Sequence, residues 1–253
     1  MTENAKNKKN AVKKAISLFS SFIAVPLAIA LGVVLFNDRK YLFVSIFIAA
    51  LSCVPFFVAF EKGRNTVREL VIIAVMSAIS VVGRLIFAPI PGFKPVAAVV
   101  IITGITLGAE AGVITGAMSA LASNVFFGQG PWTPFQMFAW GIIGFISGLL
   151  FFKRKKQNLI AVTAAGVVGG VLYSLIMDVW TTVSISGNFI FAEYLLNVTA
   201  ALPVTVEYAV SNAIFLLILT KPFVAKLNRI KLKYNVFQGD NSFENLNEST
   251  EKY

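Results

Sequence analysis

Long apolar segments alternate with short polar ones along most of the chain. A helix needs about 20 apolar residues to cross the ~30 Å hydrocarbon core of a bilayer. Eight segments approach or exceed this length: 15–36, 41–60, 70–88, 95–108, 111–127, 132–152, 159–182 and 200–220. The pattern predicts an all-α membrane protein with about eight transmembrane helices.

The same pattern divides the chain into four parts. A basic tail (1–14) precedes two N-terminal transmembrane helices (15–66), a six-helix core (67–222) and a polar C-terminal tail (223–253). Segment 95–108 is the shortest of the eight, with 14 residues, and is expected either to be re-entrant or to need protein neighbours around it.

Basic residues cluster where apolar segments end. With a cytoplasmic N-terminus, the clusters at 62–68, 153–156 and 221–233 all fall on the cytoplasmic side, as the positive-inside rule requires. Both termini are therefore predicted to be cytoplasmic in a multi-pass protein of the cell membrane. The net charge of +10, with 57% hydrophobic and only 13% charged residues, is explained by topology, and no nucleic-acid partner is expected.

The composition excludes several kinds of chemistry. The chain has no histidine and one cysteine, Cys53, which removes the commonest general base and any intrachain disulfide. The sequence contains neither a zinc-protease motif nor a phosphate-binding loop. No metal, no cofactor and no ATPase within the chain are expected, so uptake against a gradient would need a partner.

Glycines of the middle helices recur at four-residue spacing, which allows helix backbones to approach closely in lipid. The series are Gly104/Gly108/Gly112/Gly116 and Gly144/Gly148. They predict tight packing between the helices that carry them.

Three charged residues interrupt apolar segments: Arg84, Asp178 and Glu207. Charges at membrane depth are costly and usually functional, and the predicted topology places all three at one depth in the outer half. Further polar and aromatic residues are expected beside them, forming a small-molecule site: Lys94, Asn124, Gln129, Trp132, Gln136, Trp180 and Tyr208.

Each of these residues also has a structural interpretation. Arg84 could pair with Asp178 or Glu207 and only hold helices together. Trp132 and Trp180 could be interfacial anchors of the aromatic belt, and Lys94 could be a snorkelling cation.

Three stretches resemble the substrate-specific S component of energy-coupling factor (ECF) vitamin transporters. They are the segment from Ala74 to Arg84, the sequence Pro-Gly-Phe-Lys-Pro at 91–95, and Gly-Gln-Gly-Pro-Trp-Thr-Pro-Phe-Gln-Met at 128–137. The resemblance spans roughly 70–220 and implies a six-helix core that captures a vitamin outside the cell. It also implies a transmembrane T component and two ATPase subunits as partners, with Ala74 and Ala78 contacting the T component.

The stretch 129–134 resembles S components assigned to cobalamin, so a cobalamin-like vitamin or precursor is favoured and riboflavin is the next candidate. Two other classes stay open at this point: a self-contained secondary transporter, and an intramembrane enzyme that uses Asp178 and Glu207 as an acid and base. An enzyme is not favoured, because no nucleophile or metal motif accompanies the two carboxylates.

Overall fold

The computed structural model describes residues 67–152, 154, 157–187 and 189–237. The two N-terminal helices predicted for 15–66 and the basic tail lie outside the described residues. Within the described part the chain forms seven helices and no strand, as expected for an all-α protein. They are α4 (Val67–Ile86), α5 (Val96–Leu107), α6 (Ala109–Phe127), α7 (Thr133–Phe151), α8 (Leu159–Ser186), α9 (Phe191–Ala200) and α10 (Leu202–Tyr234).

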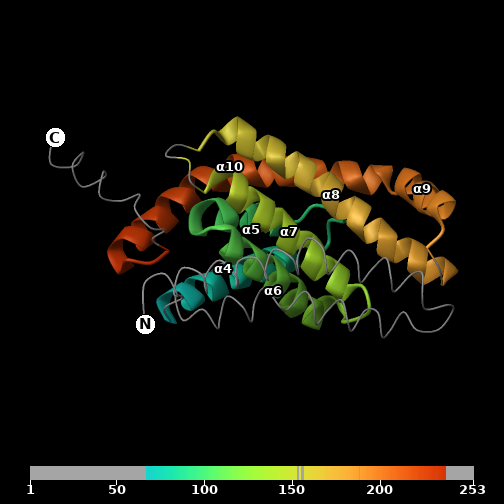
Figure 1. Cartoon of the computed structure of the whole chain (residues 1–253), viewed down its shortest axis with the longest axis horizontal. Coiled ribbons are helices and arrows are strands. Elements are labelled where there is room, and N and C mark those ends of the chain that lie inside the picture. Colours follow the sequence, from blue (N-terminus) through green and yellow to red (C-terminus); the bar gives the residue numbers. More distant parts are fainter. Residues whose placement is uncertain (1–66, 153, 155–156, 188, 238–253) are drawn as a thin grey trace, which may run out of the picture.

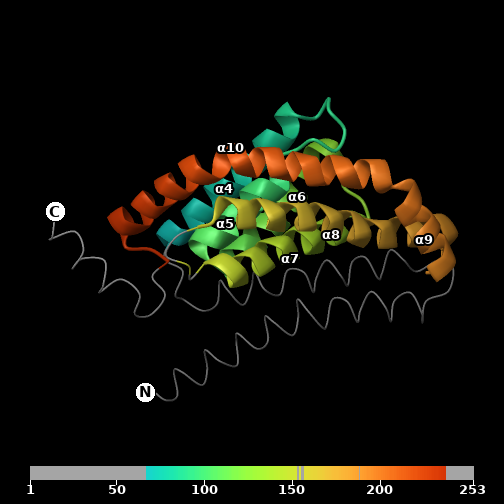
Figure 2. The ribbon, with the colours of Figure 1, turned by 90° about the horizontal axis from the view of Figure 1, so that it is seen from above.

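The helices other than α9 form a bundle with α5 at its centre (Figures 1 and 2). All 12 residues of α5 are buried, and the helix contacts α4, α6, α7, α8 and α10. Burial on every side explains why this segment is apolar around its whole circumference, and it agrees with the expectation that the short fourth segment needs protein neighbours.

Four described helices, α4, α7, α8 and α10, are long and apolar enough to cross a membrane. α5 is apolar but has only 12 residues, and α6 is not among the four. The described part therefore supports a multi-pass membrane protein, with fewer clear spans than the predicted count of about eight.

Close helix packing follows the glycine series predicted from the sequence. A Cβ atom on Gly112 of α6 would lie 2.6 Å from the carbonyl oxygen of Gly144 on α7, and one on Gly116 would lie 2.5 Å from the carbonyl carbon of Trp140. No side chain fits in such a space. The prediction of tight packing is confirmed for these helices.

Two features differ from the expected pattern at the C-terminal end. The stretch 183–199 was expected to be a loop, but it holds the end of α8 and most of α9, a ten-residue helix with no buried residue. The last helix was expected to end near 222, but α10 continues to Tyr234. The segment predicted as the start of a polar tail is helical. It is an amphipathic helix, since its basic side chains are mostly exposed while Leu227 is buried.

The C-terminal part of α10 is fastened to the rest of the bundle. Lys231 is buried, and its Nζ donates to the carbonyl oxygen of Thr106 in the last turn of α5 at 2.8 Å. Beyond the helix, the backbone N–H of Phe237 donates to Glu69 in the first turn of α4 at 2.5 Å. These contacts fasten the C-terminal end of α10 to α5 and α4. They lie at the end of the bundle opposite the connections 87–95, 128–132 and 187–201.

Candidate substrate site

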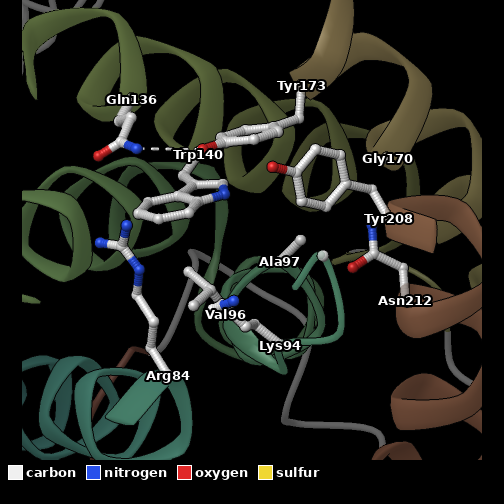
Figure 3. A pocket seen from close by; sticks show the side chains of 11 residues that line it. Arg84, Lys94, Val96, Ala97, Gln136, Trp140, Gly170, Tyr173, Tyr208 and Asn212 are labelled. Carbon is white, nitrogen blue, oxygen red and sulfur yellow. Dashed lines mark hydrogen bonds between the residues drawn. The ribbon is translucent and has the colours of Figure 1, made fainter. Parts of the chain in front are cut away.

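A cavity of about 120 Å³ lies between α4, α5, α7, α8 and α10, near the bundle end that carries the connections 87–95, 128–132 and 187–201 (Figure 3). Polar, aromatic and small residues line it in similar proportion. They are Arg84, Gly92, Lys94, Val96, Ala97, Gln136, Trp140, Gly170, Tyr173, Tyr208 and Asn212.

Arg84 occupies the last turn of α4, where a cation interacts favourably with the helix dipole. Its Nη1 donates to Ser123 and, at 2.8 Å, to the amide oxygen of Asn124, both on α6. The guanidinium also lies over two rings, with its Cζ 4.4 Å from the centroid of Phe127 and 5.1 Å from that of Trp140. The contacts of the Arg84 guanidinium are thus with neutral groups, although only 9% of the residue's surface is exposed.

The hydrogen bonds continue from Asn124 across the bundle. The Asn124 amide nitrogen donates at 2.8 Å to both Thr133 and the side-chain oxygen of Gln136 on α7. The Gln136 nitrogen then donates to the hydroxyl oxygen of Tyr173 on α8 at 3.3 Å, as the dashed line in Figure 3 shows. One chain of hydrogen bonds therefore links four helices along one side of the cavity.

Aromatic rings form another side. Trp140 and Tyr173 are stacked with ring centroids 5.2 Å apart and planes 10° apart. Tyr208 of α10 meets Tyr173 edge-on, with centroids 5.0 Å apart. Rings in these arrangements are rigid and offer an apolar surface with polar atoms at the edge, which suits a planar ligand.

The connection 87–95 brings Lys94 to the cavity. Ser211 of α10 accepts a hydrogen bond from the Lys94 backbone N–H at 2.9 Å and lies 3.1 Å from its carbonyl oxygen, to which it donates. Phe93 packs on Phe215 of α10 with ring centroids 4.9 Å apart. Burial lowers the pKa of the Lys94 amine, the charge of Arg84 lowers it further, and Glu207 opposes both effects.

Asn212 closes the side formed by α8 and α10. It donates to the carbonyl oxygen of Gly166 at 2.9 Å, and a Cβ atom on Gly170 would lie 2.8 Å from the backbone nitrogen of Ala209. The two helices cross closely here because both glycines face α10, and the crossing brings Tyr208 and Asn212 next to Tyr173.

The structure brings some of the predicted site residues together. Arg84, Lys94, Gln136 and Tyr208 line the cavity. Asn124 is fully buried behind them and reaches the cavity only through its hydrogen bonds to Arg84 and Gln136.

Other predicted residues lie away from the cavity. Gln129 and Trp132 belong to the turn before α7, where Gln129 is exposed and accepts a hydrogen bond from Thr133 at 3.0 Å. Trp180 packs against Phe135 with ring centroids 5.5 Å apart. These side chains shape the turn and the start of α7 and do not line the cavity.

The two predicted carboxylates are also outside it. Asp178 is buried on α8, and Glu207 is exposed on α10 beside Gly92. Within the described residues Arg84 forms its hydrogen bonds with Ser123 and Asn124 and has no ion pair with either carboxylate. The alternative in which Arg84 only pairs two helices through a carboxylate is thus wrong for the described structure.

Seven of the residues that line the cavity were not expected from the sequence, and three of them have polar or aromatic side chains: Trp140, Tyr173 and Asn212. Helical spacing could have found two of them. Trp140 follows Gln136 by four residues and Asn212 follows Tyr208 by four, so each pair shares a helix face.

The fold and the cavity define a multi-pass helical membrane protein with a small-molecule site near one end of its bundle. A family model described as the substrate-specific component of ECF transporters matches residues 68–228. The chain belongs to this family. Neither the curated proteins nor the solved structures gave a match.

Members of this family are substrate-binding membrane subunits of transporters and not enzymes, and they work with T and ATPase subunits. The match begins in the first turn of α4 and ends inside α10. It therefore covers every helix that lines the cavity.

Proposed function

We propose that the cavity is the substrate site of this S component, and that it captures a vitamin or vitamin precursor at the outer face of the cell membrane. The main support is the convergence, on one cavity, of two cations, three aromatic rings and two amide side chains from five separate segments. A concave site with a few directed polar groups is typical of small-molecule recognition. The positive-inside distribution of basic residues supports an outward position for this end of the bundle.

Cobalamin and riboflavin are the two candidates that the sequence suggests, and the size of the cavity bears on the choice. Pockets that enclose drug-sized ligands have volumes of about 300–1,000 Å³, whereas this one has about 120 Å³. One planar ring fits such a volume. Cobalamin would have to bind across the opening with one peripheral group inside, so the volume favours a vitamin more compact than cobalamin.

We also propose that Ala74 and Ala78 are the contact with the T component. Both are exposed on α4, and Val71, Val75 and Val82, also on α4, are 55%, 52% and 52% exposed. Small residues four apart let another helix approach closely. Uptake would then follow from ATP hydrolysis by the two partner ATPases.

Thermal unfolding of the detergent-purified full chain tests the first proposal. Cobalamin, riboflavin, thiamine, biotin and folate are added separately, and one of them is expected to raise the melting temperature. A ligand that binds only the folded state stabilises it by about 2.7 kcal/mol at 100 times its Kd. The variant Ala97→Leu fills the cavity and is expected to abolish that shift.

An alanine-to-leucine change elsewhere provides a matched control. Ala78→Leu is exposed on α4, so it is expected to keep the ligand-induced shift but to lower vitamin uptake by cells that contain the whole transporter. A wild-type protein that none of the five vitamins stabilises would contradict the proposed substrate class. An Ala78→Leu variant with normal uptake would contradict the proposed T-component contact.

A further inference from the structure

The hydrogen-bond chain beside the cavity has a fixed direction. The guanidinium of Arg84 can only donate, so the oxygen of the Asn124 amide faces it. The Asn124 nitrogen is therefore turned toward Gln136 and donates to its oxygen. This in turn leaves the Gln136 nitrogen to donate to Tyr173.

The direction of the chain decides what Tyr173 offers to a ligand. Its hydroxyl oxygen already accepts a hydrogen bond from Gln136, and among the described residues it is not a donor in any hydrogen bond. A phenol has one proton to donate. Since Tyr173 lines the cavity, this proton is available to a bound molecule.

Two further residues that line the cavity carry donors, Arg84 and Lys94. Arg84 Nε is buried and lacks a hydrogen-bond partner in the described part of the chain, and a buried donor without a partner is costly. Lys94 Nζ donates to the carbonyl oxygen of Ile90 at 3.1 Å, which uses one of its three protons. Arg84, Lys94 and Tyr173 thus have more hydrogen-bond donors than the described residues around them supply acceptors for.

The charges at the cavity are also unbalanced. Arg84 and Lys94 line it, and no carboxylate is among its lining residues. Glu207 is the carboxylate that acts on Lys94, but it is exposed beside Gly92 and is not among the residues that line the cavity. Two cations near each other in a partly buried site repel, and an anion between them removes that repulsion.

We infer that the substrate carries a carboxylate or phosphate group, whose oxygens accept hydrogen bonds from Arg84, Lys94 and the hydroxyl of Tyr173. The inference rests on the proposed function of the cavity as the substrate site, and it adds the chemical class of the substrate. Of the five vitamins named above, biotin and folate carry a carboxylate, whereas riboflavin carries neither group and does not meet this requirement. The planar part of the same molecule lies against Trp140 and Tyr208. A neutral amide cannot satisfy this set of donors equally well, because its nitrogen is itself a donor and it carries no negative charge to offset the two cations.

Three small probes with the same ring test this directly: benzoate, phenyl phosphate and benzamide. Each is titrated into the full-length protein in detergent at constant ionic strength, and Kd is measured by calorimetry. We expect benzoate or phenyl phosphate to bind at least about tenfold more tightly than benzamide. The stronger of the two anions identifies the group that the site prefers.

The variant Asn124→Asp is the sharpest test, because it changes the direction of the chain without touching the ligand. Its carboxylate neutralises Arg84 and accepts from Gln136, which then turns its oxygen toward Tyr173 and takes the hydroxyl proton. The anion preference is expected to disappear. Tyr173→Phe removes only one hydroxyl and is the second variant should Asn124→Asp not fold, and Lys221→Gln controls for the loss of a positive charge far from the cavity.

Two results with the wild-type protein overturn the inference: benzamide binding as tightly as both anions, or no binding by any of the three probes. Retention of the anion preference in both Asn124→Asp and Tyr173→Phe also overturns it. These results are separate from failure of the proposed function. A vitamin that binds wild type and Asn124→Asp equally would support the substrate site and contradict only the inference of an anionic group. Binding of the anionic probes without binding of any vitamin would contradict the proposed vitamin class and support the anion site.

Discussion

Trp140 and Tyr173 lie face to face across α7 and α8, with ring centroids 5.2 Å apart. Trp140 is the one tryptophan of three in the chain that lines the cavity. Substrate binding changes the surroundings of this indole, so the protein's tryptophan fluorescence is expected to change when the vitamin binds. Trp140→Phe should abolish most of that change.

The other two tryptophans supply the controls. Trp132→Phe and Trp180→Phe alter residues outside the cavity and are expected to keep both the fluorescence change and the Kd within about twofold, since substitutions away from a site usually have effects below about 0.5 kcal/mol. Loss of the signal in Trp132→Phe but not in Trp140→Phe would place the ligand at the turn before α7 and contradict the assignment of the cavity.

The sequence located four of the residues that line the cavity: Arg84, Lys94, Gln136 and Tyr208. Arg84 and Lys94 were predicted because a charge in or beside an apolar segment is conspicuous. Asp178 was chosen for the same reason, yet on α8 it is five residues from Tyr173, a rotation of roughly 140°. Only Tyr173 faces the cavity, because the close crossing at Gly170 determines which side of α8 meets α10.

The helices themselves were more predictable than the site. Long apolar runs located α4, α6, α7 and α8 within a few residues, since lipid and protein interior both require apolar side chains. The last part of α10 was missed because it is amphipathic, and a search for continuous apolar segments cannot detect one buried face. α9 was missed because it has only ten residues and none of them is buried.

Gly144 provides a test of the close packing. A Cβ atom there would lie 2.5 Å from the carbonyl oxygen of Gly112, so Gly144→Ala is expected to lower the free energy of unfolding by about 1–3 kcal/mol. On the same helix, a Cβ atom on Gly141 has its nearest neighbour at 3.6 Å. Gly141→Ala should be neutral or stabilising by up to about 1 kcal/mol, because alanine favours a helix more than glycine does.

Thermal unfolding in detergent distinguishes the two glycine variants. Equal melting temperatures for Gly144→Ala and Gly141→Ala would mean that α6 and α7 can separate at no cost, contrary to the tight packing seen between them.

Gly92 tests the connection that carries Lys94. Its φ of +65° disfavours any other residue, and a Cβ atom there would lie 2.7 Å from the Cβ of Glu207. Gly92→Ala is therefore expected to weaken substrate binding, since it displaces the backbone that lines the cavity. Gly128→Ala is the matched control: Gly128 has a φ of +95° but no neighbour within 4 Å, so it incurs only the conformational cost of roughly 1–2 kcal/mol.

Calorimetric Kd values for both variants separate the two effects. Binding that is weakened in Gly92→Ala and unchanged in Gly128→Ala supports the connection 87–95 as part of the site. The double variant Gly92→Ala/Glu207→Gly should recover part of the loss, because it removes the side chain that the new methyl group meets. Unchanged substrate affinity in Gly92→Ala argues against any role of this connection.

Lys231 tests whether the C-terminal part of α10 supports the core. Its amine donates to the carbonyl oxygen of Thr106 at 2.8 Å and lies 4.8 Å from the ring centroid of Phe152. A carbonyl in the last turn of α5 has no partner within its own helix, so Lys231→Met should destabilise the protein by about 1–3 kcal/mol. The exposed Lys233 is the control, and Lys233→Met is expected to change stability by less than about 0.5 kcal/mol. Because α5 also lines the cavity through Val96 and Ala97, Lys231→Met should weaken substrate binding as well; equal effects of the two lysine variants would instead show that α5 keeps its position without this contact.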